Sequence, residues 1–159
     1  MKIDTSYFYQ IRFFRPYEIP FSTAVWDPHW YHDFKDQKYN FIDKRGVLNG
    51  LRNSDFRPGR ECENLCRGPE TCISKDPYHC DFLETYAKQL RSLNPTLIEK
   101  YFKDVCGQIA IKMKLDVEPK PILIVHEAPD KLCSERIVIQ QVLHEFGFEC
   151  EEWSPLSTR

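Results

Sequence analysis

Residues 121–125 read Pro-Ile-Leu-Ile-Val, and residues 126–136 continue His-Glu-Ala-Pro-Asp-Lys-Leu-Cys-Ser-Glu-Arg. The first stretch has no polar alternation, which is typical of a strand covered on both faces, as in parallel sheets flanked by helices. Beyond the second stretch, apolar residues at helical spacing and a closing Gly147 predict a helix from about residue 133 or 134 to 146. A buried strand that leads into a helix is the building unit of an α/β fold.

Shorter strands are expected on either side of this unit. Residues 3–8 and 21–25 predict two of them, and Pro20 suits the first residue of the second strand. Residues 148–153 alternate less cleanly and would form a last strand. Between these segments, residues 26–60 are polar and rich in turn signals, so we expect long loops there with at most short helices.

Two further helices follow one another in the middle of the chain. Apolar residues at helical spacing predict a helix over 82–93. Asn94 and Pro95 then resemble the cap and first-turn proline of a second helix, whose apolar positions continue to Ile109. The whole chain, residues 1–159, is therefore predicted to be a single α/β domain with a small, mostly parallel sheet flanked by helices, and with a long Cys-rich metal-binding loop.

The composition indicates a globular protein. Hydrophobic residues make up 42% of the 159 residues and charged residues 29%, and the aromatic share of 14% is high. The formal net charge of -2 argues against capture of nucleic acid by bulk charge, so a nucleic-acid partner would need a local basic patch. The chain has no long apolar run and its beginning does not resemble a signal peptide. We therefore expect a soluble, cytoplasmic protein without a membrane partner; its oligomeric state is left open.

Cysteines cluster in the insertion at residues 60–81. Four soft thiol ligands in one short loop suit a tetrahedral metal ion, and zinc is the first candidate, with an iron–sulfur cluster as the alternative. A group of reduced thiols without metal is the other interpretation, and His79 would be a substitute ligand. A closed four-ligand site would brace the loop instead of carrying out chemistry. The predicted ligands are Cys62, Cys66, Cys72 and Cys80.

The loop after the buried strand carries the predicted reactive residues. In open α/β sheets, ligands bind beyond the carboxyl ends of the strands, where a following helix offers free N–H groups and a positive dipole end. His126 and Glu127 would exchange protons there, and Cys133 would be a thiolate stabilised at the helix start. Ser134 and Arg136 would bind an anionic ligand such as a phosphate or a carboxylate.

Each of these residues also has an ordinary structural interpretation. Arg136 would pair on the surface with Glu135, Glu127 or Asp130, and Cys133 would be a small packed residue at a helix start. His126 would be an interior histidine bonded to a backbone carbonyl. Cysteine phosphatase chemistry is disfavoured, because only two residues separate Cys133 from Arg136 and the phosphatase signature has five.

An aromatic segment at residues 26–34 would complete the pocket. Trp26, His29 and Trp30 would stack and hydrogen-bond a nucleobase or a similar ring, or the segment would instead be a lid packed on the protein's own core. Hydroxyl groups of the first strand would reach the same crevice. The residues that carry them are Thr5, Ser6 and Tyr7.

Four segments, in order, resemble the motifs of the domain of unknown function 488 family. They are DTSYFYQIR at 4–12, IPFSTAVWDPHWY at 19–31, CDFLETYAKQLRSLNP at 80–95 and ILIVHEAPDKLCSERIVIQQVLHEFG at 122–147. The family's Cys-His-Arg is Cys133-Ser134-Glu135-Arg136 here, and His126 stands where the family has Cys or Tyr. The resemblance covers most of the chain. It implies a small α/β fold and a ligand pocket built by these motifs, without an established activity.

These observations predict a pocket for a small anionic ligand, with a nucleotide or a nucleic-acid end as the first candidate. The leading hypothesis is an enzyme that acts on a nucleotide-derived substrate through hydrolytic or base and glycosyl chemistry. One alternative is a nucleotide-binding or sequestering protein without catalysis. Another is a zinc-braced protein-interaction module in which the aromatic segment is the docking surface.

Overall fold

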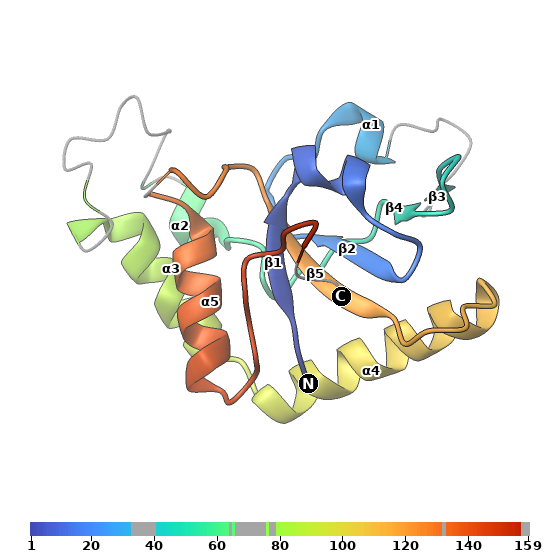
Figure 1. Cartoon of the computed structure of the whole chain (residues 1–159). Helices are drawn as coiled ribbons and strands as arrows, with labels where there is room; N and C mark the ends of the chain where they lie inside the picture. The colour runs from blue at the N-terminus through green and yellow to red at the C-terminus, as the bar shows by residue number, and fades with distance from the viewer. Residues whose placement is uncertain (33–40, 64, 66–75, 77–78, 132, 157–159) are drawn as a thin grey trace.

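The computed structural model describes residues 1–32, 41–63, 65, 76, 79–131 and 133–156 (Figure 1). Helices lie around a small central sheet, and a pair of very short strands lies apart from it. In chain order the elements are β1 (Asp4–Tyr7), η1 (Phe8–Phe13), β2 (Glu18–Ser22), α1 (His29–His32), β3 (Phe41–Ile42), β4 (Leu48–Asn49), α2 (Arg60–Glu63), α3 (Asp81–Arg91), α4 (Pro95–Lys112), β5 (Lys120–Val125) and α5 (Glu135–Glu145).

The central sheet is parallel and has the order β1-β5-β2. The predicted strand at 121–125 is its middle strand, β5, paired with β1 on one side and with β2 on the other. Leu123 lies opposite Thr5 of β1 and Phe21 of β2. The prediction of an α/β fold with a small, mostly parallel sheet is thus confirmed, with β3 and β4 forming a separate antiparallel pair.

The segment 148–153 runs beside β1 but is not a regular strand. It makes single parallel bridges, of Glu149 with Lys2 and of Glu152 with Thr5. Four backbone hydrogen bonds between described residues hold it there, at 2.7–3.2 Å: Ile3 N to Glu149 O, Glu149 N to Met1 O, Thr5 N to Glu151 O and Trp153 N to Thr5 O. These contacts place the side chain of Glu152 next to β1.

The second strand begins earlier than predicted. We expected it at 21–25 with Pro20 at its first residue, but β2 spans Glu18–Ser22 and Pro20 lies in its middle, opposite Ile122. A strand tolerates proline where no neighbour needs its N–H group. Because β2 is the edge strand of the sheet, Pro20 leaves no ladder hydrogen bond unmade.

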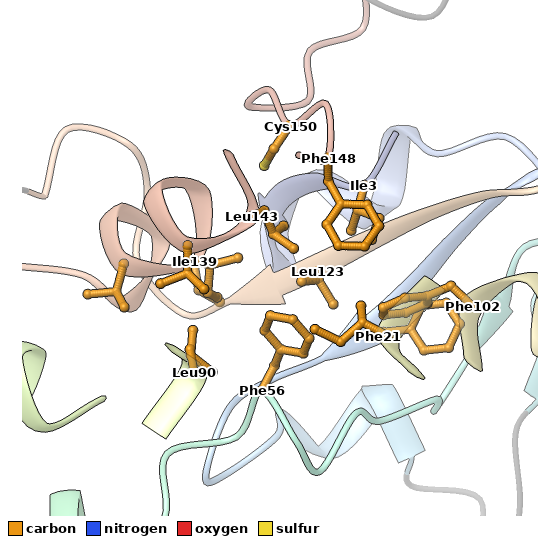
Figure 2. Close-up of a cluster of buried hydrophobic side chains, with 14 of the residues drawn as sticks. Ile3, Phe21, Phe56, Leu90, Phe102, Leu123, Ile139, Leu143, Phe148 and Cys150 are labelled. Carbon is orange, nitrogen blue, oxygen red and sulfur yellow. The ribbon is translucent and has the colours of Figure 1, made fainter. Parts of the chain in front are cut away.

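The two faces of β5 bury different clusters, because side chains alternate along a strand. Leu123 and Val125 belong to the cluster formed with α3, α4 and α5, which Figure 2 shows around Leu123, Ile139 and Leu143. Ile122 and Ile124 belong to the opposite cluster, with η1, Tyr31 and Trp153. Burial on both faces explains the uninterrupted apolar run, since each such side chain contributes about 1.5–3 kcal/mol.

Local signals define the helix ends: the cap of α4 and the glycine after α5 are as predicted, whereas the cap of α5 was not predicted. Asn94 caps α4 by accepting a hydrogen bond from Thr96 N at 2.9 Å, and Pro95 is the first helical residue. Ser134 caps α5 in the same way through Arg136 N at 3.3 Å. Gly147 follows α5 with a φ of 90°, the left-handed conformation that ends many helices. The start of α5 is therefore fixed at the point where the predicted site lies.

Candidate functional site

The predicted site lies at the carboxyl edge of the sheet. Because β1, β5 and β2 are parallel, they end on the same edge, and η1, the loop after β5 and the segment before α1 all leave from it (Figure 1). The loop of residues 126–134 then returns to the first turn of α5. This arrangement brings together residues from the beginning, the middle and the end of the chain.

Two glutamates form the acidic part of the site. Glu127, just after β5, accepts a hydrogen bond from Ser134 Oγ at 3.2 Å, and its carboxyl group also hydrogen-bonds to that of Glu135. Burial, and then the negative charge of Glu127, raise the pKa of Glu135 to about 7, whereas the charge of Arg136 acts in the opposite direction. Burial and the neighbouring carboxylate thus both favour the protonated form of Glu135.

Arg136 faces inward. Only 5% of its surface is exposed. Its Nε donates to Glu152 Oε1 at 2.5 Å, its Nη2 donates to the backbone oxygen of Glu127 at 2.7 Å, and its guanidinium carbon lies 5.8 Å from the centre of the Tyr7 ring. These contacts give the arginine an internal carboxylate partner and tie the loop after β5 to the C-terminal segment.

The hydroxyl group of Thr5 in β1 hydrogen-bonds to this ion pair. Thr5 Oγ1 donates to Glu152 Oε1 at 2.8 Å and accepts from Gln140 Nε2 at 2.7 Å. Burial is the main cause of a raised pKa at Glu152, which the positive charge of Arg136 offsets in part. Three buried polar atoms of this region have no hydrogen-bond partner among the described residues. They are Ser6 Oγ, Arg136 Nη1 and Glu152 Oε2.

Three residues of this network were not predicted: Glu135, Gln140 and Glu152. Glu135 has a local signal, since an acid in the first helical turn beside a serine cap is common. Glu152 and Gln140 have no local sequence signal, because their roles depend on the segment 148–153 lying against β1. Only the tertiary fold brings a residue near the C-terminus to the first strand.

His126 and the aromatic segment lie on the other side of the loop. The Nε2 of His126 hydrogen-bonds to the backbone oxygen of Trp26, and the His126 ring lies 5.1 Å from that of Phe8. Phe8 in turn meets Trp30 edge-on at 6.2 Å. The indole of Trp26 is 80% exposed, and His29 is exposed as well. Trp30 is therefore packed against a ring that itself contacts His126.

Cys133 is half-buried immediately before the capping Ser134. The positive charge of Arg136, which we expected to stabilise a thiolate there, is directed to Glu152 and to the Glu127 carbonyl. Tyr7, the other predicted contact from β1, is half-buried, and its hydroxyl accepts a hydrogen bond from Gln10 at 2.9 Å. Their roles toward a ligand stay predictions.

The predicted metal ligands fall partly outside the described residues. Cys66 and Cys72 lie there, whereas Cys62 in α2 and Cys80 before α3 are buried in the same core cluster. The thiol of Cys62 is 3.8 Å from Gln89 Oε1, and His79 pairs with Asp76 at 2.6 Å. Within the described ranges no three His, Cys, Asp or Glu side chains form a metal-binding group. The zinc site and its iron–sulfur alternative stay predictions.

Comparisons with known proteins add no further assignment. No family model, no curated protein and no solved structure matches the chain. The resemblance to the domain of unknown function 488 family therefore stays a prediction based on the motifs. In the described part of the chain, no helix is both long enough and apolar enough to cross a membrane.

Proposed function

We propose that the protein is a hydrolase of a small nucleotide-derived substrate, with the Glu127–Glu135 pair as its proton-transfer group. The observation that supports this proposal is the hydrogen-bonded contact of the two carboxyl groups, together with the pKa of about 7 for Glu135. A general acid or base works best when its pKa lies near the working pH. Both glutamates are half-buried, so a substrate would approach them from the open edge of the sheet.

The contact between the carboxyl groups favours hydrolysis through a shared proton. Glycosidases that use two carboxyl groups keep them about 5–9 Å apart, on opposite sides of the bond that breaks. A pair in direct contact resembles instead the dyad in which one carboxylate takes a proton from water while the other carboxylic acid donates one. In this scheme Glu127 removes a proton from the attacking water and Glu135 protonates the leaving group, so the pair ends with its proton moved from one member to the other.

Activity screening tests the proposal. Purified protein is incubated with nucleoside and nucleotide pools, and products are identified by mass spectrometry. We expect a product that is lost by about a hundredfold or more in Glu135→Gln and in Glu127→Gln, because loss of a general acid or base removes that much rate. Glu145→Gln is the matched control, since Glu145 is on the same helix and pairs with Arg91 at its far end. Product formed equally by the Glu135 and Glu145 variants would contradict the proposal.

A non-catalytic nucleotide-binding protein is the second candidate. The observation that favours it is the internal pairing of Arg136 with Glu152, because an arginine neutralised in this way has less charge to offer a reacting phosphate. Recovery of a tightly bound nucleotide that stays unchanged during the same incubations supports this candidate over the hydrolase.

A further inference from the structure

A second hollow lies beside the site, between η1, α1 and the β3–β4 pair. Its volume is about 500 Å³, within the range of pockets that hold small organic ligands. Figure 1 shows α1 and the β3–β4 pair on the same side of the sheet. Phe8 lines this pocket and also contacts His126, so the pocket adjoins the loop after β5 without including the two glutamates.

The walls of the pocket are fixed by internal hydrogen bonds. Arg45, in the turn between β3 and β4, donates from Nη2 to Ile11 O at 3.0 Å and to Asp43 Oδ2 at 2.7 Å, which ties that turn to the end of η1. Tyr31 is fully buried, and its hydroxyl donates to Leu51 O at 2.6 Å, which anchors α1. A pocket held in this way needs little ordering when a ligand binds.

The charge of the lining is positive and comes from Arg12. Asp43 neutralises Arg45, and this pairing, together with hydrogen bonds to the backbone, lowers the pKa of the Asp43 carboxyl although burial opposes the shift. Arg12 is exposed, and its Nε donates to Tyr9 O at 2.9 Å while its guanidinium lies 3.7 Å from the centre of the Tyr9 ring. The two Nη groups remain directed to no hydrogen-bond acceptor among the described residues, so an anion has donors to bind.

We propose that this pocket binds a nucleoside monophosphate. The flat base packs against the rings of Phe8 and Trp30, and the phosphate pairs with Arg12. The nucleotide class rests on the proposed function, whereas the binding itself does not need proton transfer at Glu127 and Glu135. A protein that binds the nucleotide without hydrolysing it therefore leaves this inference intact and removes only the hydrolase.

Titration calorimetry with two probes tests the inference. We expect AMP to bind the full chain at one site. Ribose 5-phosphate, which lacks the ring, should bind about tenfold more weakly. Saturable binding of AMP that equals the binding of ribose 5-phosphate would overturn the proposal, as would absence of AMP binding.

Two matched pairs of variants locate the site. Arg12→Gln and Trp30→Ala should each weaken AMP binding by about tenfold, through loss of the phosphate contact and of the stacking contact. Arg15→Gln and Trp26→Ala should stay within about twofold of the unchanged protein, because neither residue lines the pocket. Since Arg12 is exposed, its variant should fold even where the Trp30 variant does not. Equal affinities of the Arg12 and Arg15 variants would overturn the assignment.

Discussion

The side chains of Arg136 and Glu152 form a buried ion pair, with Nε and Oε1 2.5 Å apart. The pair joins the first turn of α5 to the segment that runs beside β1, and the hydroxyl of Thr5 donates to the same carboxylate oxygen. Removing two charges from water is costly, and their mutual attraction offsets that cost only while both partners are present. The ion pair therefore affects both the stability of the sheet edge and the shape of the site.

Arg136→Met should be clearly destabilising. The variant leaves Glu152 buried without its cation, and we expect a loss of about 2–3 kcal/mol in the free energy of unfolding. This is the lower part of the usual range, because 26% of the Glu152 side chain is exposed. Urea unfolding of the variant and of the unchanged chain measures the difference.

The double variant Arg136→Met, Glu152→Gln is the control for this prediction. It removes the unpaired charge, so we expect it to be more stable than Arg136→Met alone. A double variant that is no more stable than the single one would show that lost packing of the arginine, and not the buried charge, causes the effect.

The stability of the protein should depend on pH through Glu135. Its pKa of about 7 in the folded chain lies above the value of 4.5 for a free glutamate, so between these values the folded state holds a proton that the unfolded state has lost. The contribution of Glu135 is thus fully favourable below about pH 4.5 and declines as the pH rises toward 7, by up to about 1.4 kcal/mol per pH unit.

Glu135→Gln isolates this contribution. The free energy of unfolding of the unchanged chain, measured at several pH values between 5 and 7 in denaturant, should fall more steeply with pH than that of the variant. Glu152, whose pKa is also raised by burial, is present in both proteins. The difference between their slopes of unfolding free energy against pH therefore measures the contribution of Glu135. Parallel slopes would contradict a raised pKa at this position.

Local chemistry accounts for the parts of the fold that the sequence predicted correctly. The apolar run in β5, the cap at Asn94 and the glycine at 147 each depend on a few neighbouring residues, so short segments carry the information. The helix of 82–93 was found in the same way, as α3. Periodicity was less reliable at the helix surface: Leu97, one of the apolar residues at helical spacing in the predicted second helix, is 61% exposed.

The sequence predicted that Glu127, Ser134 and Arg136 lie near one another, but not which groups they contact. They meet at the edge of the sheet because the strand before their loop and the helix after it were recognisable. The partner of Arg136 was not predicted. We expected a nearby surface carboxylate such as Glu135, whereas Arg136 pairs with Glu152 in the structure. The ion pair depends on a tertiary contact of a segment with poor strand periodicity, and no local pattern encodes such a contact.

Two glycines should respond in opposite ways to replacement by alanine. Gly147 has a φ of 90°, where a side chain is strained although nothing lies within 4 Å of the added carbon. Gly147→Ala should therefore destabilise the protein by about 1–2 kcal/mol. Gly107 lies inside α4 with equally open surroundings, so Gly107→Ala should stabilise it by about 0.5–1 kcal/mol. Thermal unfolding measures both, and a stabilising change at 147 would contradict the assigned conformation.

Zinc analysis of the purified protein tests the metal site that was predicted from the cluster of cysteines. Cys62 and Cys80 are buried in one core cluster at the two ends of the Cys-rich insertion, so a metal bound by the four cysteines would connect α2 to the start of α3. We expect one equivalent of zinc in the unchanged chain and loss of metal in the Cys66→Ser, Cys72→Ser variant, because removal of two ligands destroys a closed tetrahedral site. Removing zinc from the unchanged chain with a chelator should lower its melting temperature, since metal binding to such a site contributes to folding.

Cys106→Ala is the control for the zinc experiment. Cys106 is buried in α4, and burial raises the pKa of its thiol to about 12, so it stays protonated and does not act as a metal ligand. The variant should retain the full zinc content. Iron with sulfide in place of zinc would support the cluster alternative, because four cysteines also hold iron–sulfur centres. Absence of both metals from the unchanged chain would leave the reduced thiols as the correct interpretation, since a closed four-thiolate site does not survive purification empty and folded.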